Sequence, residues 1–493
     1  PKLVSNSEDL YKKFIDKGLI LDKEEFIMKA EKKNDPYEVI QHRVPNSIKK
    51  QLEDLAISAV GFELEPGRFY PAGNFASQTI GFVGADGTGQ YGLERFYNKD
   101  LSGENGSFTG DGSAGTRLLL FGKSLISHKK DGASIHLTID AGVEAFLVSS
   151  LEATLKKYNA KSAGGIIMNP RTGKILAFAS MPSYDPNLYS KEKDPNVFKN
   201  PLVENLFEMG SVIKPLTIAA ALDAGAIQST DTYVDTGNRT IDGRRIENFD
   251  GKARGRVPIQ EILSQSLNMG AVHVMEKLGK DRLRDYFHKY AFAEKTNIDL
   301  PNEAVGNLKN LDSSRLIEYA TASFGQGINM TPLALARALS SLGNGGLLVT
   351  PYIVEEVRYA NGLTQQKKVP EPKRVLKEET SKTITRMLVE VVDTKLAGGH
   401  GKIPGYSVAA KTGTAQIASV DRRGYSDEFM HTFFGYGPAY DPQFLVVLYI
   451  ERPQGIRYAS ESLTEPFRSI MKHLFSYFEV LPDRPQELND KKL

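Results

Sequence analysis

The sequence predicts a chain of two or three domains, the largest of which combines helices with a mainly antiparallel sheet. A chain of 493 residues is too long for one ordinary hydrophobic core. Strand-like and helical segments intermingle from residue 131 to residue 482, whereas glycine and proline punctuate residues 61–115. We therefore expect an α+β or α/β multidomain fold. Its parts are a mixed N-terminal domain (1–130), a main domain (131–482) and a polar tail (483–493).

The composition excludes several classes of function. The formal net charge is +2, which gives no electrostatic case for a nucleic-acid partner. The chain has no cysteine, which excludes disulfides, thiolate metal sites and cysteine nucleophiles. Its eight histidines are scattered and form no His-Glu-x-x-His pattern, so we expect neither a metal site nor a cofactor. No apolar run reaches the length of a transmembrane helix.

The N-terminal domain begins with polar helical segments over residues 1–50, in which charged residues surround Leu10, Tyr11 and Phe14. Short strands such as Thr79–Val83 are expected in the turn-rich region that follows. Gly87–Gly92 there matches the dinucleotide fingerprint Gly-x-Gly-x-x-Gly. The fingerprint also needs a second buried strand that ends in an acidic residue, and a turn over Leu101–Gly106 stands in its place. We therefore reject nucleotide binding.

The main domain opens with clear strand and helix signals. Ser134–Ile139 alternates as a strand, and Ala141–Tyr158 has the periodicity of an amphipathic helix. Gly164–Met168 and Lys174–Ala179 are predicted as two buried strands, joined by the turn residues Asn169–Gly173. The segment after Pro482 is polar, and we expect it to fray.

Ser211 lies at the predicted start of a buried helix. Ala219–Leu222 are strong helix formers, and Pro215 is tolerated only in a first turn. Lys214 follows Ser211 by three residues, so both side chains share one face. A serine becomes a nucleophile when a neighbouring base takes its proton, and a desolvated lysine can be that base. Because four other Ser-x-x-Lys patterns occur in the chain, only the helix setting distinguishes Ser211.

Two further patterns occur once each in the chain. Ser266-x-Asn268 lies between apolar runs, and its hydroxyl and carboxamide can converge only in a tight turn. Lys411-Thr412-Gly413, followed by Thr414, is a small-residue strand with a cation and hydroxyls that suit a carboxylate. Gly413 would let a ligand approach the backbone. Taken alone, the first pattern favours a turn or cap and the second an edge strand with an exposed lysine.

The three patterns occur in the order that the serine β-lactamases and penicillin-binding proteins share. The chain resembles class B, monofunctional penicillin-binding proteins, the D,D-transpeptidases that cross-link bacterial peptidoglycan. Arg68-Phe69-Tyr70-Pro71 is similar to the family's Arg-x-Tyr-Pro element, and Gly89–Gly106, which includes Glu94, is similar to its glycine-glutamate element. Segments near the end, Glu451–Pro453 and Leu463–Phe467, are also similar to family patterns.

The resemblance implies an elongated, non-catalytic pedestal over residues 1–130 and a transpeptidase domain, similar to the serine β-lactamases, over residues 131–482. In the pedestal, Arg68 and Glu94 are expected to form an internal ion pair. The roles implied in the main domain follow the order of the reaction. Ser211 attacks the penultimate D-Ala carbonyl of a stem peptide, Lys214 takes its proton, Ser266 relays the proton, Asn268 holds the peptide backbone, and Lys411, Thr412 and Thr414 bind the terminal carboxylate.

The resemblance also implies partners and a location. Stem peptides and β-lactam antibiotics are the expected ligands, and a membrane-embedded glycosyltransferase with division or elongation proteins is the expected set of protein partners. The catalytic part is expected outside the bacterial cell membrane, in the periplasm. Relatives usually carry an N-terminal transmembrane helix, and we expect that anchor to be absent from this chain. Ser323–Ile328 before Thr331-Pro332, together with the ending near Pro482, lean towards the septal type.

Two rival functions remain open at this point. A D,D-carboxypeptidase or β-lactamase would use the same serine for hydrolysis, although a single compact domain leaves residues 1–130 unexplained. A non-catalytic β-lactam sensor or scaffold would need no complete catalytic set. Acylation and release of a labelled penicillin would separate the three.

Overall fold

The structure is a computed structural model that describes residues 1–32, 34–42, 44–63, 67–103, 130–419 and 424–489. These residues form two compact units, Pro1–Phe69 and Tyr70–Leu493. The domain boundary that we expect near residue 130 stays a prediction. Gly106 of the glycine-glutamate element lies outside the described residues. None of the helices in the described ranges has the length and apolarity that crossing a membrane requires.

The N-terminal unit is helical, as predicted. It contains α1 (Ser7–Asp16), α2 (Lys23–Ala30) and α3 (Asn46–Glu53). Side chains cap the first two helices: Asn6 accepts a hydrogen bond from the N–H of Asp9, and Asp22 accepts one from Glu25. A small core of six buried residues holds the unit together, namely Leu10, Phe14, Leu19, Phe26, Ala30 and Leu52.

Residues 70–101 fold as three short helices rather than strands. They are α4 (Ser77–Ile80), α5 (Gly92–Phe96) and α6 (Asn98–Leu101). The strand expected over Thr79–Val83 is therefore wrong. Gly81 has a φ of +78°, which breaks the extended backbone, and a Cβ there would lie 1.8 Å from the carbonyl oxygen of Tyr91. The close packing of these short helices overrides the local strand signal.

The glycines of the rejected dinucleotide pattern have a packing role. A Cβ on Gly89 would lie 2.0 Å from the backbone oxygen of Glu94, and one on Gly92 would lie 2.4 Å from that of Thr79. The neighbouring helix α4 is in turn bonded to the central sheet of its unit, because the hydroxyl of Thr79 donates to the carbonyl of Phe178 in that sheet at 3.2 Å. The glycines let the backbone of this turn contact α4 and α5.

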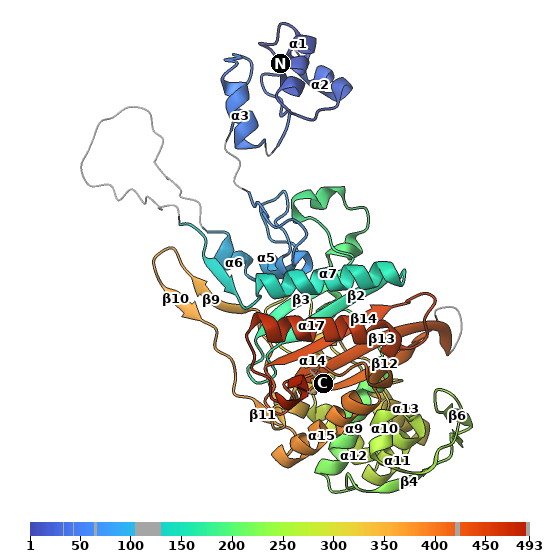
Figure 1. Cartoon of the computed structure of the whole chain (residues 1–493). Helices are drawn as coiled ribbons and strands as arrows, with labels where there is room; N and C mark the ends of the chain where they lie inside the picture. Colours follow the sequence, from blue (N-terminus) through green and yellow to red (C-terminus); the bar gives the residue numbers. More distant parts are fainter. Residues whose placement is uncertain (33, 43, 64–66, 104–129, 420–423, 490–493) are drawn as a thin grey trace, which may run out of the picture. The chain divides into compact units, whose positions relative to one another are not determined.

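A five-stranded antiparallel sheet forms the centre of the larger unit (Figure 1), which confirms the predicted sheet type. The strand order is β12-β13-β14-β2-β3, and every neighbouring pair is antiparallel. The predicted strand pair and its turn are confirmed as β2 and β3. The strands are β2 (Ser162–Met168), β3 (Ile175–Met181), β12 (Ala409–Ala418), β13 (Tyr425–Gly437) and β14 (Phe444–Glu451).

Helices cover both faces of this sheet. The predicted helix α7 (Ala141–Lys157) packs with α17 (Thr464–Tyr477) over one face, and α14 (Pro332–Gly343) packs against the other. A helical region adjoins the β12 edge and contains the site (Figure 1). Its longer helices are α9 (Lys214–Asp223), α11 (Asn268–Leu278), α12 (Lys280–Lys289) and α15 (Glu378–Thr394).

Short elements complete the larger unit. The helical ones are α8 (Pro201–Glu204), α10 (Gln260–Ser264), α13 (Leu316–Ala322), α16 (Ala459–Ser462) and α18 (Gln486–Asn489). The 3₁₀ helices are η1 (Pro186–Lys191), η2 (Pro195–Phe198), η3 (Gly210–Ile213), η4 (Lys309–Asp312) and η5 (Leu396–Gly399). The small sheets contain β1 (Ser134–Leu137) with β9 (Val354–Arg358) and β10 (Thr364–Gln366), β4 (Thr232–Asp235) with β7 (Gly255–Pro258), β5 (Asn238–Ile241) with β6 (Arg244–Glu247), and β8 (Leu347–Leu348) with β11 (Lys373–Arg374).

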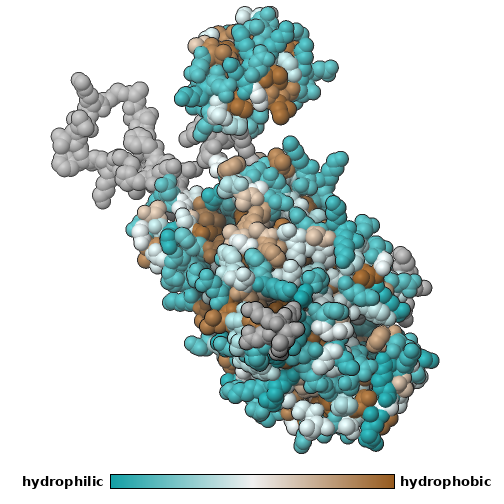
Figure 2. Space-filling model, in the orientation of Figure 1, coloured by the Kyte–Doolittle hydropathy of each residue, from teal (hydrophilic) through white to brown (hydrophobic). Residues whose placement is uncertain are grey.

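The polar tail is ordered as far as the description reaches, so the expected fraying is wrong for residues 483–489. The carboxylate of Asp483 accepts hydrogen bonds from the N–H (2.8 Å) and the hydroxyl of Ser407. The guanidinium of Arg484 pairs with Asp393 at 2.8 Å. Hydrogen bonds and an ion pair thus anchor this segment, which its low hydrophobicity did not indicate. The surface in Figure 2 is mostly hydrophilic, with scattered apolar residues.

Candidate active site

The turn before α9 brings Ser211 to the edge of the sheet. Ser211 lies in η3, one 3₁₀ turn before Lys214, and the helix α9 begins at Lys214 with Pro215 in its first turn, as predicted. Gly210 has a φ of +64° and donates its N–H to the carbonyl of Gly325 at 3.2 Å. A Cβ on Gly325 would lie 2.2 Å from the carbonyl oxygen of Gly210, so glycine at both positions lets this turn form.

Lys214 is fully buried, and its amine is held by three oxygens. Its Nζ lies 2.5 Å from the carbonyl oxygen of Ser266, 2.8 Å from Oδ1 of Asn268 and 3.2 Å from Oγ of Ser266. Burial lowers the pKa of Lys214 well below its usual value, and the positive charge of Lys411 lowers it further. Burial therefore favours the neutral form of this amine, which is the form that can accept a proton.

Ser266 and Asn268 lie in the tight turn that joins α10 to α11, as the spacing predicted. Ser266 has a φ of +54°, in the left-handed region, and Asn268 is the first residue of α11. The carboxamide of Asn268 donates to the carbonyl of Glu247 at 2.9 Å, while its oxygen accepts from Lys214. A hydroxyl and a carboxamide thus converge on one buried amine.

Lys411 lies on β12, the edge strand of the sheet, but it is only 2% exposed. This burial contradicts the exposed edge-strand lysine that the tripeptide alone favoured. Its Nζ donates to Oγ of Ser266 at 3.1 Å and to the carbonyl of Thr412 at 3.0 Å. Burial lowers the pKa of Lys411 to about 7. The Ser266 hydroxyl is therefore within hydrogen-bond distance of both lysines, which brings the three sequence patterns together.

The rest of β12 packs against the nucleophile turn. The hydroxyl of Thr432 on β13 donates to the carbonyl of Met209 at 2.8 Å, and a Cβ on Gly413 would lie 2.2 Å from that hydroxyl. Gly413 therefore lets the strand approach the turn, which is a different reason from the ligand access that we expected. Thr412 and Thr414 are half-buried, and the hydroxyl of Thr414 accepts a hydrogen bond from the N–H of Ala459 at 3.0 Å.

Several residues that support the site gave no signal in the sequence. The carboxamide of Asn248 accepts from the N–H of Met269, beside Asn268, and donates to both oxygens of the buried Asp235 at 3.0 Å. Glu208, three residues before Ser211, accepts from the hydroxyl of Tyr425 at 2.9 Å. Burial raises the pKa of Glu208. These residues are isolated polar positions in loops and strands, so no spacing rule could identify them.

The two residues of the predicted Arg68–Glu94 ion pair belong to different compact units. Glu94 is buried, and its carboxylate accepts a hydrogen bond from the hydroxyl of Tyr70 at 3.3 Å. The pair stays a prediction.

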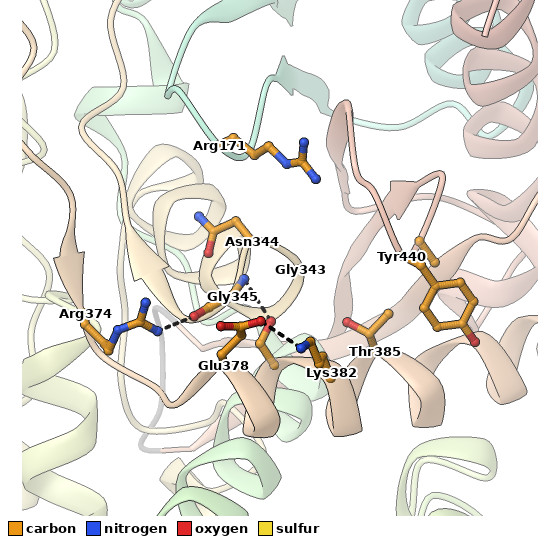
Figure 3. Close-up of a pocket in the computed structure, with 11 residues that line it drawn as sticks. Arg171, Gly343, Asn344, Gly345, Arg374, Glu378, Lys382, Thr385 and Tyr440 are labelled. Carbon is orange, nitrogen blue, oxygen red and sulfur yellow. Dashed lines mark hydrogen bonds and ion pairs between the residues drawn. The ribbon is translucent and has the colours of Figure 1, made fainter. Parts of the chain in front are cut away.

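A cavity of about 280 Å³ in the larger unit contains none of the predicted site residues (Figure 3). Its charged lining residues already have partners: Arg171 pairs with Asp441, Lys382 pairs with Glu378, and Arg374 donates to the carbonyl of Gly345. The predicted site residues gather elsewhere, between η3, the α10–α11 turn and β12.

Most of the chain is similar to known proteins. The family model described as penicillin binding protein transpeptidase domain matches residues 163–472. The chain is 33% identical to stage V sporulation protein D of Bacillus subtilis over 449 residues, which are 90% of this chain and 69% of that protein. It is 30% identical to a probable peptidoglycan D,D-transpeptidase, PenA, of Neisseria meningitidis, over 93% of this chain and 76% of that protein. The crystal structure of penicillin binding protein 2X from Streptococcus thermophilus has the same fold, with a TM-score of 0.78 and 23% identity over 96% of this chain and 73% of that one.

Proposed function

The chain belongs to the penicillin-binding protein transpeptidase family, and from this premise we propose how its own residues cross-link peptidoglycan. It is a serine-type D,D-transpeptidase that acts on stem peptides ending in D-Ala-D-Ala, and β-lactams acylate the same serine. One observation carries the proposed division of roles. The hydroxyl of Ser266 lies 3.2 Å from the Nζ of Lys214 and 3.1 Å from the Nζ of Lys411.

Acylation begins at Ser211. Its hydroxyl attacks the penultimate D-Ala carbonyl, and the neutral amine of Lys214 takes the proton as the carbon–oxygen bond forms. The backbone N–H groups of Ser211 and Thr414 stabilise the negative oxygen of the tetrahedral intermediate, and each such donor is worth about 3–4 kcal/mol. The carbon–nitrogen bond then breaks. The leaving D-Ala amine receives a proton through the hydroxyl of Ser266, and an ester on Ser211 remains.

Deacylation transfers the acyl group to a second stem peptide. The acceptor amine attacks the ester carbonyl, Lys214 takes the amine proton, and the bond to Ser211 breaks as the serine regains its proton. The new amide is the cross-link. The same groups serve both steps, because the amine of Lys214 ends each step in the state in which it began.

The burial of Lys214 supports its role as the base. An exposed lysine is protonated at neutral pH and cannot accept a proton. Here burial and the nearby charge of Lys411 lower the pKa of Lys214, while Ser266 and Asn268 fix the position of its nitrogen.

Residues of β12, together with Asn268, bind the substrate. Lys411, Thr412 and Thr414 bind the terminal carboxylate, and the carboxamide of Asn268 orients the peptide backbone. The pKa of Lys411 is about 7, so a bound carboxylate beside it shifts the amine towards its protonated form. The ion pair between Lys411 and the substrate carboxylate then forms as the substrate binds.

We also propose protein partners, a location and a cellular role. Residues 1–130 serve as a non-catalytic pedestal that contacts a membrane-embedded glycosyltransferase and division or elongation proteins. The catalytic part works in the periplasm, where peptidoglycan is cross-linked, and the septal type is favoured over the elongation type. A fluorescent fusion of the anchored protein that labels the division site would support the septal assignment, whereas labelling along the whole cell wall would contradict it.

A labelled penicillin tests the enzymatic proposal. Mass mapping of the adduct should find it on the peptide that contains Ser211, and the label should be released slowly. Ser211→Ala should give no adduct. Rapid turnover of the label would indicate a β-lactamase, and an adduct on another serine would refute the assignment. Incubation with two stem peptides should yield a cross-linked dimer, since release of D-Ala without a dimer would indicate a carboxypeptidase.

A further inference from the structure

A buried histidine ties the substrate-binding strand to the segment beside it. His431 lies on β13 directly opposite Thr414 in the strand register, and its ring is fully buried. Its Nε2 lies 3.0 Å from the carbonyl oxygen of Arg457, and its Nδ1 lies 2.8 Å from Oγ of Ser462. One ring therefore contacts both ends of the segment Arg457–Ser462, which includes α16.

The partners of this ring fix its tautomer. A carbonyl oxygen can only accept a hydrogen bond, so Nε2 carries the proton and donates it to Arg457. The Nδ1 atom of the neutral ring then accepts from the hydroxyl of Ser462. Burial lowers the pKa of His431 to about 4, which keeps the ring neutral at physiological pH. Both hydrogen bonds are therefore directional and present at working pH.

The segment Arg457–Ser462 contacts the substrate-binding strand β12 through the backbone N–H of Ala459. Ala459 lies between the two anchored residues, and its N–H donates to the hydroxyl oxygen of Thr414 at 3.0 Å. An oxygen that already accepts this bond is held in one rotamer, and its own proton remains available as a donor. The hydroxyl of Thr414 can then donate to the carboxylate of the substrate.

We propose that His431 is a positioning residue for acyl transfer: it anchors Arg457–Ser462 so that Ala459 holds the Thr414 hydroxyl ready to donate to the substrate carboxylate. The proposal rests on the proposed function, because Thr414 matters only if this strand binds the carboxylate. No sequence pattern indicates this arrangement, since His431 is the only histidine in β13 and belongs to none of the three patterns.

Variants of the histidine separate its hydrogen bonds from its bulk. His431→Leu removes both hydrogen bonds of the ring. We expect the second-order rate constant of acylation by penicillin to fall about five- to tenfold, a change of the size that the loss of one neutral hydrogen bond causes. His431→Gln keeps a donor for the carbonyl of Arg457 and should stay within about twofold of the unmodified protein. Ser462→Ala, a small change that should fold, removes one anchor and should give a smaller loss.

A matched control is His473→Leu. His473 is a partly buried histidine on α17 that stacks on Phe146 with 4.0 Å between ring centroids, away from the substrate-binding strand. Its replacement should lower the melting temperature and leave the acylation rate unchanged. A loss in this control as large as that of His431→Leu would overturn the proposal.

A double-mutant cycle provides the decisive measurement. If His431 acts through Thr414, then His431→Leu should lower the acylation rate in the unmodified protein but by less than twofold in a Thr414→Val background. Additive losses would overturn the proposal. If His431→Leu does not fold, the same cycle with Ser462→Ala decides. Mass mapping on the unmodified protein is done first, so that a missing Ser211 adduct refutes the proposed function separately.

Discussion

The charge of Lys411 should set the pH at which Lys214 becomes an effective base, and Lys411→Met tests this coupling. Both nitrogens lie close to one oxygen, at 3.1 Å and 3.2 Å, so they are at most ~6 Å apart. At that distance two unit charges repel by about 3 kcal/mol at an effective dielectric constant of ~20. A shorter separation would increase the repulsion, so this value is the lower limit of the coupling at that dielectric constant, and it corresponds to roughly a hundredfold change in proton affinity.

The sign of the effect follows from the charges. The positive charge of Lys411 disfavours protonation of Lys214, so its removal raises the pKa of Lys214. More of the base is then protonated at a given pH. The acidic limb of the acylation profile should therefore move to higher pH in Lys411→Met. The full effect applies below about pH 7, where Lys411 carries its charge.

The assay is the second-order rate constant for acylation by a fluorescent penicillin, measured between about pH 5.5 and pH 9.5. Lys411→Arg is the control, because it keeps a charge at this position while changing the shape of the donor. Its acidic limb should stay near that of the unmodified protein, even if the rate falls. A Lys411→Met profile that is lower by the same factor at every pH, with an unmoved limb, would refute the coupling.

Three further predictions concern the base and two buried carboxylates. Lys214→Ala should nearly abolish acylation while Lys411→Ala only weakens it, as measured by penicillin labelling; equal, mild losses would contradict their roles. Asp223→Ala should lower the free energy of unfolding in urea by about 3–5 kcal/mol, because its carboxylate accepts three hydrogen bonds at 2.6–2.9 Å, one of them from a backbone N–H at the start of α15. A loss below ~1 kcal/mol would count against this reasoning. Glu94→Ala should cost about 1–3 kcal/mol through its buried hydrogen bond and leave labelling of Ser211 intact in folded protein. Folded protein without labelling would show that the pedestal belongs to the active site.

The sequence by itself determined the local features of this protein. Interactions between residues a few positions apart explain three of these features. They are the helix start at Ser211, the position of Lys214 one helical turn after Ser211, and the strand pair β2–β3. The order of the three patterns identified the chemistry. These signals survive because propensity, capping and turn formation depend on near neighbours in the chain.

Only the tertiary structure decided how the patterns meet. The hydroxyl of Ser266 contacts two lysines that are 52 and 145 residues away, and burial by distant segments lowers the pKa of both lysines. The same dependence on distant partners explains the wrong predictions. Gly81 bends away from a strand because it packs on Tyr91, and Asp483 is ordered by Ser407. Periodicity records which face of an element is apolar, but not which polar group another part of the chain will bring to it.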